Sequence, residues 1–295
     1  MKLGFNLLLW TTHVREDQFH LIDDLKATGF DGVEIPLFEG DVAHYEKLGK
    51  KIKQAGMSSS AVTVMIGGNA LSPDKAQRDA ALNHLKWAID RAAALGSDIL
   101  CGPFHQPLGE FTGIGPTEDE KNRCAEVHKA AAHYAAKAGI KLSVEPLNRF
   151  ECYFLNTAKA SADLVARVGE KNYGYLYDTF HFHIEEKSQP EAIRQTISAI
   201  NHVHISENDR GTPGTGQVNF DAVFKALKSS GYDGWLTVEA FGSALPDLAA
   251  ATKIWRPLFD KPEDVYPASA CLPLQQLFLF LCGRDRHQIT QLRNL

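Results

Sequence analysis

Short apolar runs alternate with longer amphipathic stretches along most of this chain, and the alternation predicts eight strand–helix units. The predicted strands are Lys2–Trp10, Gly32–Leu37, Ser59–Met65, Asp98–Phe104, Lys141–Leu147, Tyr173–Thr179, His202–Glu207 and Gly234–Ala240. The predicted helices are Asp17–Thr28, Tyr45–Ala55, Asp74–Leu95, Thr117–Ala138, Ala158–Val168, Pro190–Ile200, Phe220–Ser230 and Pro246–Arg256. Repeated units of this kind imply a parallel sheet with right-handed crossovers.

Eight units can close into a barrel, and 295 residues is an ordinary length for one. We therefore predict an α/β fold, a (β/α)8 TIM barrel in a single domain over residues 1–260, with a C-terminal extension over 261–295. The rival is a doubly wound open sheet, which usually carries a Gly-rich phosphate loop after its first strand. Here that position holds Trp10-Thr11-Thr12-His13. The extension contains an apolar run, Leu277–Leu281, that is too short to span a bilayer but suits a subunit contact.

Charge and cysteine content exclude several classes of protein. A net charge of −5 argues against a protein that tracks nucleic-acid phosphates, since those usually carry a basic excess. The apolar N-terminal stretch is too short for a membrane span, and no small-residue cleavage site follows it. The five cysteines are scattered and form no CxxC pair, which is typical of reduced thiols. We expect a cytoplasmic protein that binds neither nucleic acid nor membrane.

Ionisable side chains interrupt the ends of four successive predicted strands, the fifth to the eighth: Glu145, Asp178, His204 and Glu239. Catalytic groups of a barrel lie at the carboxyl ends of its strands, so these side chains should converge. A carboxylate at an apolar strand end is costly unless it is paired or bound to metal. Three carboxylates with one imidazole favour a hard divalent cation over zinc. We predict one divalent ion per chain, with Mn²⁺ the first choice and Co²⁺ or Mg²⁺ the alternatives.

Other polar residues have simpler interpretations. A lone carboxylate at a strand end is more often a loop cap or an ion-pair partner, and only the four equivalent positions together favour a metal site. His202 is expected to face away from His204 or to cap the start of its strand. His183 and the pair Glu185-Glu186 are expected to form a solvated helix entrance.

Longer motifs surround these positions: Val144-Glu145-Pro146-Leu147-Asn148-Arg149-Phe150-Glu151, Asp178-Thr179-Phe180-His181, His204-Ile205-Ser206-Glu207-Asn208-Asp209-Arg210, and Gly231-Tyr232-Asp233-Gly234 leading to Glu239. Over roughly residues 1–260 the chain resembles the ketose 3-epimerases, which act on tagatose, psicose or ribulose within the xylose-isomerase-like barrels. The resemblance implies that Glu145, Asp178, His204 and Glu239 bind the metal. It also implies that Glu151, His181 and Arg210 hold the sugar hydroxyls and carbonyl oxygen, and that the chain forms a homodimer or homotetramer. The segment Gly102–Pro107 departs from the family pattern.

The implied reaction interconverts the C3 epimers of free ketoses: ribulose and xylulose, tagatose and sorbose, or psicose and fructose. A proton leaves the carbon next to the C2 carbonyl and returns on the other face, through an enediolate that a metal stabilises. Glu145 and Glu239 come from different strands and can flank the sugar, so they are the predicted catalytic residues. An aldose–ketose or hydroxypyruvate-type isomerase would use the same site but move the proton between C1 and C2. A metal-dependent phosphodiesterase or a catalytically silent sugar-binding barrel would also fit the fold.

Overall fold

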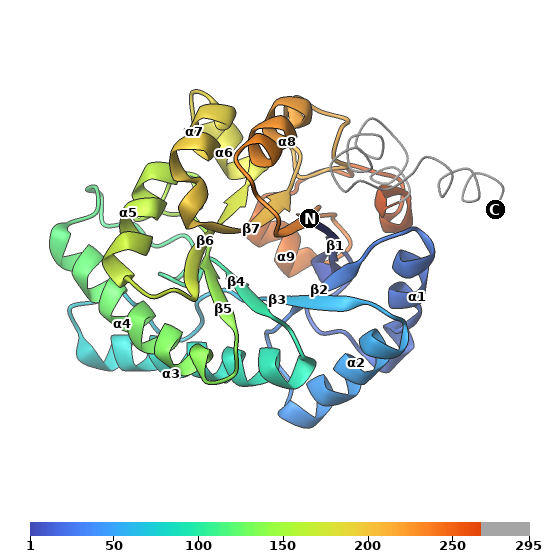
Figure 1. Ribbon diagram of the computed structural model, residues 1–295, viewed down its shortest axis with the longest axis horizontal. Helices are drawn as coiled ribbons and strands as arrows, with labels where there is room; N and C mark the ends of the chain where they lie inside the picture. The colour runs from blue at the N-terminus through green and yellow to red at the C-terminus, as the bar shows by residue number, and fades with distance from the viewer. Residues whose placement is uncertain (267–295) are drawn as a thin grey trace.

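The computed structural model describes residues 1–266, and its strands close into a parallel barrel (Figure 1). The strands are β1 (Lys2–Asn6), β2 (Gly32–Pro36), β3 (Ser58–Val62), β4 (Ile99–Gly102), β5 (Lys141–Val144), β6 (Tyr173–Asp178), β7 (Ile200–Ile205) and β8 (Trp235–Val238). Each strand pairs in parallel with the next, and β8 closes the ring on β1. The predicted (β/α)8 barrel is confirmed.

Helices cover the outside of the barrel (Figure 1). They are α1 (His20–Ala27), α2 (Val42–Gln54), α3 (Lys75–Leu95), α4 (Glu118–Ala136), α5 (Ala158–Val168), α6 (Thr179–Glu185), α7 (Gln189–Thr196), α8 (Phe220–Ser229) and α9 (Pro246–Thr252), with 3-10 turns at η1 (Leu7–Leu9), η2 (Glu16–Gln18), η3 (Ile197–Ala199) and η4 (Pro262–Asp264). Their ends follow local chemistry. Thr117 and Glu120 form a capping box at the start of α4, and Gly96, with φ of 81°, ends α3 in the left-handed region.

Several bounds differ from the sequence prediction, for example at β7 and α9, and two differences have a clear local cause. The first strand ends at Asn6 rather than Trp10, because the Asn6 side chain accepts a hydrogen bond from the Leu8 amide and starts η1. The short helix α6 was not predicted. It begins directly after β6 because Asp178 Oδ1 accepts a hydrogen bond from the Phe180 amide at 2.6 Å, so one carboxylate both ends a strand and caps a helix.

Packing against the barrel continues past residue 260. The side chain of Val265 is fully buried in the core, and Trp10 Nε1 donates to Glu263 Oε1 at 3.1 Å. The Tyr266 ring lies 6.0 Å from the Trp10 ring. The domain boundary at residue 260 therefore stays a prediction, and the apolar run Leu277–Leu281 lies outside the described residues.

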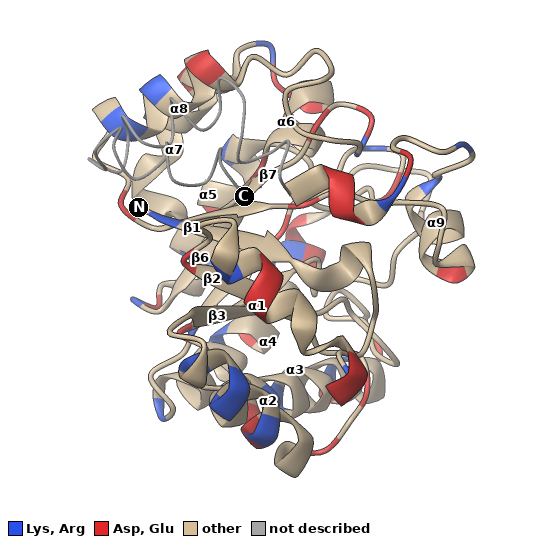
Figure 2. Cartoon of the chain, turned by 90° about the vertical axis from the view of Figure 1, so that its right-hand side faces the viewer, with Lys and Arg blue, Asp and Glu red and all other residues tan. Residues whose placement is uncertain are grey.

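Figure 2 shows acidic and basic segments on the same outer helices, for example on α2 and α8. Within residues 1–266, no helix combines the length and the apolar character that crossing a bilayer requires. Opposite charges on one helix are typical of a solvated surface.

Candidate active site

The structure brings together the side chains of Glu145, Asp178, His204 and Glu239, which we call the strand-end cluster. Each residue offers one ligand atom, and these atoms all lie within 4.8 Å of one another. Glu145 follows β5, Asp178 ends β6, His204 lies in β7 and Glu239 follows β8. All four side chains are buried.

Strand register explains the convergence. Asp178 and His204 are direct partners in the β6–β7 pairing, and His204 pairs with Thr237 of β8, two residues before Glu239. Within the cluster, His204 Nδ1 lies 3.3 Å from Glu239 Oε1 and 4.0 Å from Asp178 Oδ2. Parallel pairing of consecutive strands thus delivers these side chains to one end of the barrel.

The donor set suits a divalent cation. His204 Nδ1 is buried and makes no hydrogen bond of good geometry, although Glu239 Oε1 lies 3.3 Å away, and such a nitrogen is costly unless a ligand uses its lone pair. The three carboxylates beside it carry excess negative charge, with Arg210 as the neighbouring guanidinium. Oxygen ligands with one imidazole are the set that Mn²⁺ and similar ions accept. The four residues could therefore hold one such ion.

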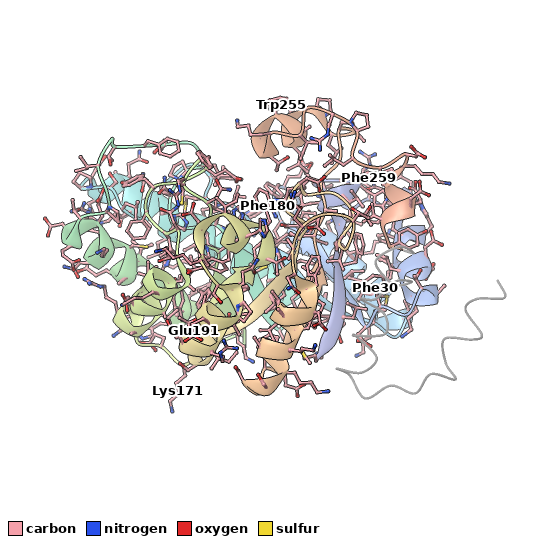
Figure 3. The ribbon with its side chains drawn as sticks, turned by 90° about the horizontal axis from the view of Figure 1, so that it is seen from above. Phe30, Lys171, Phe180, Glu191, Trp255 and Phe259 are labelled. Carbon is pink, nitrogen blue, oxygen red and sulfur yellow. The ribbon has the colours of Figure 1, made fainter. Side chains whose placement is uncertain are left out.

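Arg210 binds two of these carboxylates. Its Nη1 donates to Asp178 Oδ2 at 2.8 Å and to Glu239 Oε2 at 2.7 Å. Its backbone has a φ of 66°, the left-handed region, and the Phe241 amide donates to its carbonyl at 2.9 Å. The guanidinium carbon lies 4.0 Å from the centre of the Phe180 ring, and Phe180 lies toward the middle of the molecule in Figure 3. The Arg210 charge is therefore held at the centre of the site.

His181 has a donor against each of its ring nitrogens. Its Nδ1 accepts a hydrogen bond from the Asn148 amide at 3.0 Å, and burial, with Arg210 and His204 nearby, lowers its pKa well below the usual range. Its Nε2 lies 2.8 Å from Arg210 Nη2 and 3.5 Å from Glu145 Oε1. A neutral imidazole accepts at one nitrogen only and a guanidinium only donates, so these contacts fix the position of the ring and not its tautomer.

Glu151 lies beside this pair without joining the cluster. Its Oε1 accepts from Asn148 Nδ2 at 2.7 Å, so Glu151 positions the residue that fixes His181. Its side chain is half-buried. Nearby, Arg149 Nη2 lies 2.7 Å from Glu185 Oε2. The expected solvated entrance at Glu185 is therefore wrong: this residue ends α6, and its side chain is only 4% exposed because it pairs with Arg149.

The two carboxylates predicted to move protons differ in electrostatic environment. Burial and the neighbouring Glu239 charge raise the pKa of Glu145 well above its usual value. Burial would also raise the pKa of Glu239, but His204 and Arg210 outweigh it and lower that pKa. Opposite shifts in a pair of titratable groups are typical of an acid and a base that work together.

Sequence reasoning missed a second group of polar residues, which shares His204 with the first. Glu34 is fully buried and binds both His202 and His204, with Nε2–oxygen distances of 2.8 and 2.7 Å. His202 therefore faces the same side as His204, contrary to prediction, because residues two apart in a strand share a face. The rule that a carboxylate inside an apolar strand is costly, applied to Gly32–Leu37, would have found Glu34.

Comparison with known proteins decides the family. Residues 22–260 match the family model described as xylose isomerase-like TIM barrel. The chain belongs to this family. Among curated members it is 32% identical over 269 residues to the ketose 3-epimerase of Arthrobacter globiformis, covering 90% of this chain and 93% of that protein. It is 31% identical over 265 residues to the L-ribulose 3-epimerase of Mesorhizobium japonicum, covering 88% of each.

The fold of this xylose isomerase-like barrel also matches solved structures. The D-allulose 3-epimerase of Methylomonas sp. in complex with D-allulose superposes with a TM-score of 0.85 at 26% identity, covering 97% of both chains. The resemblance to ketose 3-epimerases and the prediction of a carbohydrate isomerase are confirmed by these relatives.

Proposed function

We propose that this enzyme is a metal-dependent ketose 3-epimerase that interconverts the C3 epimers of free ketoses. The observation that carries the proposal is the pairing of Glu145 and Glu239, two buried carboxylates from different strands whose pKa values shift in opposite directions. The names of the relatives, ketose 3-epimerase and L-ribulose 3-epimerase, support the same reaction.

The residues proposed to hold the cation are Glu145, Asp178, His204 through Nδ1, and Glu239, with Mn²⁺ the first choice and Co²⁺ or Mg²⁺ the alternatives. When bound, the ion supplies positive charge that stabilises the negative charge developing on the substrate oxygens. The buried Nδ1 of His204, which makes no hydrogen bond of good geometry, is the feature that best supports this assignment.

Proton transfer is assigned to Glu145 and Glu239. Each can hold the cation with one oxygen and handle a proton with the other; the raised pKa of Glu145 favours its protonated form, and the lowered pKa of Glu239 favours its carboxylate form. One residue can therefore remove the C3 proton while the other returns a proton on the opposite face, and the roles exchange in the reverse reaction. No redox cofactor is needed, because the substrate and product have the same oxidation state.

His181 and Arg210 are proposed to bind the C2 oxygen of the ketose. His181 Nε2 and Arg210 Nη2 lie 2.8 Å apart beside the strand-end cluster, so one substrate oxygen can contact both nitrogens. The Arg210 guanidinium stabilises negative charge on that oxygen when the C3 proton leaves. Glu151, on the same turn as Asn148, is proposed to accept a hydrogen bond from a sugar hydroxyl.

The proposal is tested by proton exchange in D₂O. The enzyme is incubated with D-allulose, D-tagatose and L-ribulose, with Mn²⁺ added or after metal removal with EDTA, and deuterium is located by NMR. We expect deuterium at C3 and formation of the C3 epimer only when metal is present. Deuterium at C1 without exchange at C3 would instead establish an aldose–ketose or hydroxypyruvate-type isomerase. Equal turnover in the metal-free enzyme would refute the metal site.

We also propose that the protein is a cytoplasmic homodimer or homotetramer. The free thiols of Cys101, Cys124 and Cys152 support a reducing compartment. Exposed aromatic side chains at Phe150 and Trp255, which are 72% and 75% accessible, offer apolar surface for a partner. Light scattering on the full chain and on a chain ending at residue 266 tests both the assembly and the contribution of the extension.

A further inference from the structure

Glu34 lies in β2 and is the centre of a buried network, which we call the Glu34 cluster. Oε1 accepts from Asn6 Nδ2 at 3.0 Å and from His204 Nε2 at 2.7 Å. Oε2 accepts from Ser60 Oγ at 2.8 Å, from His202 Nε2 at 2.8 Å and from Cys101 Sγ at 3.2 Å. All these partners can donate, so they hold Glu34 as a carboxylate that accepts every bond.

The first consequence concerns the His204 ring. Because Nε2 gives its proton to Glu34, Nδ1 of a neutral ring carries none. Nδ1 is the atom that faces the strand-end cluster, 3.3 Å from Glu239 Oε1. A ring with its proton on Nδ1, or on both nitrogens, could not donate a lone pair to a cation.

The second consequence concerns Glu239. Asn6 Nδ2 donates both to Glu34 Oε1 at 3.0 Å and to Glu239 Oε1 at 2.9 Å. The Asn6 side chain is fixed at its other end, since its Oδ1 accepts from the Leu8 amide at 2.9 Å. Glu34 is therefore linked by hydrogen bonds to two residues of the strand-end cluster, to His204 directly and to Glu239 through Asn6.

A rival interpretation is that the same side chains bind a second cation. Glu34, Cys101, His202 and His204 each offer a ligand atom close to the others. The two imidazole nitrogens, however, lie 2.7 and 2.8 Å from the Glu34 oxygens, the ordinary length of a charge-assisted hydrogen bond with a proton between the atoms. Asn6 and Ser60 fill further lone pairs of the same carboxylate. Protons alone therefore satisfy the Glu34 carboxylate, although His202 Nδ1 makes no hydrogen bond.

We propose that Glu34 is a positioning residue for the metal: it selects the His204 tautomer that presents Nδ1 and, through Asn6, it orients Glu239. The inference rests on the proposed function, because it takes the strand-end cluster as the metal site. Carboxylates that orient a metal-binding histidine typically change metal affinity 10- to 100-fold when they are replaced.

The test compares Glu34→Gln with the matched control Glu207→Gln. Glu207 is also a fully buried carboxylate with several hydrogen bonds, to the amides of Asn208, Gly214 and Val218, but these bonds hold a loop. Mn²⁺ is titrated into the metal-free proteins by calorimetry, and bound metal per chain is counted by elemental analysis. We expect one Mn²⁺ per wild-type chain, a dissociation constant raised about 10- to 100-fold in Glu34→Gln, and an unchanged constant in Glu207→Gln.

The state of the His204 ring is read from its ¹⁵N shifts in the wild-type enzyme loaded with diamagnetic Mg²⁺, a measurement that needs no variant to fold. We expect a proton on Nε2 and none on Nδ1, and a changed shift pattern in Glu34→Gln. An Nε2 without a proton in the loaded wild type, wild-type Mn²⁺ affinity in Glu34→Gln, or two Mn²⁺ per chain with one lost in Glu34→Gln would each overturn the proposal. Failure of the proposed function is distinct: Mn²⁺ would bind with these differences, but no C3 exchange would occur.

Discussion

The Glu34 cluster and the strand-end cluster both include His204, but their carboxylates differ in the number of hydrogen bonds that they accept. In the Glu34 cluster both oxygens of one carboxylate accept hydrogen bonds from side chains of β1, β3, β4 and β7. In the strand-end cluster, Asp178 and Glu239 each accept one short bond per oxygen, from Phe180 and Arg210 or from Asn6 and Arg210, and the nearest donor to Glu145 is His181 Nε2 at 3.5 Å. A saturated carboxylate fixes its neighbours, whereas carboxylates with spare lone pairs can bind a cation or accept a proton.

The pKa directions follow the same contrast. Burial would raise the pKa of Glu34, but His204 and His202 outweigh it and hold that pKa well below the usual range. Burial and the Glu239 charge act together on Glu145 and raise its pKa. Similar burial thus gives opposite results, because only one of the two carboxylates has enough donors.

The largest effect is expected from the strand-end cluster. Glu145→Gln and Glu239→Gln should each lower the rate of C3 exchange at saturating Mn²⁺ by about 10³-fold, since each removes a group that moves a proton. Exchange is measured by NMR in D₂O, with Glu191→Gln on the exposed side of α7 as the control that keeps full activity. Wild-type exchange in either variant would remove that residue from the mechanism.

Stabilisation of the fold by Mn²⁺ should depend on residues of the strand-end cluster and not on Cys101 of the Glu34 cluster. The wild-type enzyme should gain about 2.7 kcal/mol in its free energy of unfolding when Mn²⁺ is raised to 100 times its dissociation constant. Asp178→Asn should lose most of this gain because it removes a proposed ligand, whereas Cys101→Ala should keep it. Urea unfolding with Mn²⁺ and with EDTA measures both. An equal gain in wild type and Asp178→Asn would contradict the assignment of Asp178.

A donor of the Glu34 cluster should matter whether or not metal is present. Ser60→Ala removes the 2.8 Å hydrogen bond to Glu34 Oε2 and should lower the free energy of unfolding by about 1.5–3 kcal/mol, the range for bonds to charged groups. The loss should be the same in EDTA and in Mn²⁺. A loss seen only with Mn²⁺ would mean that the saturated carboxylate takes part in metal binding more directly than we propose.

The subtlest expected difference is the pH dependence of stability in EDTA. The pKa of Glu34 falls below its ordinary value of 4.5 on folding, so its stabilising contribution is present above pH 4.5 and disappears as pH falls through the folded pKa. The pKa of Glu145 rises above 4.5, so its contribution is present below pH 4.5 and disappears as pH rises through the folded pKa. The urea midpoint of unfolding is measured as a function of pH. Glu145→Gln should reduce the fall in the midpoint as pH rises above 4.5, and Glu34→Gln should reduce the fall as pH drops into the acid range. The same change in both variants would contradict the contrast.

The barrel could be predicted from the sequence because its signals are local. Apolar periodicity, helix caps and glycine stops are read within a few residues of each element, and the order of the units implies the topology. Given the barrel, chain order alone predicts that the ends of strands five to eight meet, and the structure brings Glu145, Asp178, His204 and Glu239 together. The helix α6 escaped prediction because a single side chain, Asp178, caps it inside a motif that otherwise continues a strand.

What only the tertiary structure decided is which donors satisfy which carboxylate. Glu34 meets His202 and His204 across 168 and 170 residues of sequence, from β2 and β7, which are not neighbours in the barrel. Strand patterns give the face on which a side chain lies, but not the distances across the barrel interior that join it to side chains of non-adjacent strands. The sequence therefore identified the residue types of a metal site, while the fold decided that one histidine nitrogen is committed to Glu34 and the other faces the strand-end cluster.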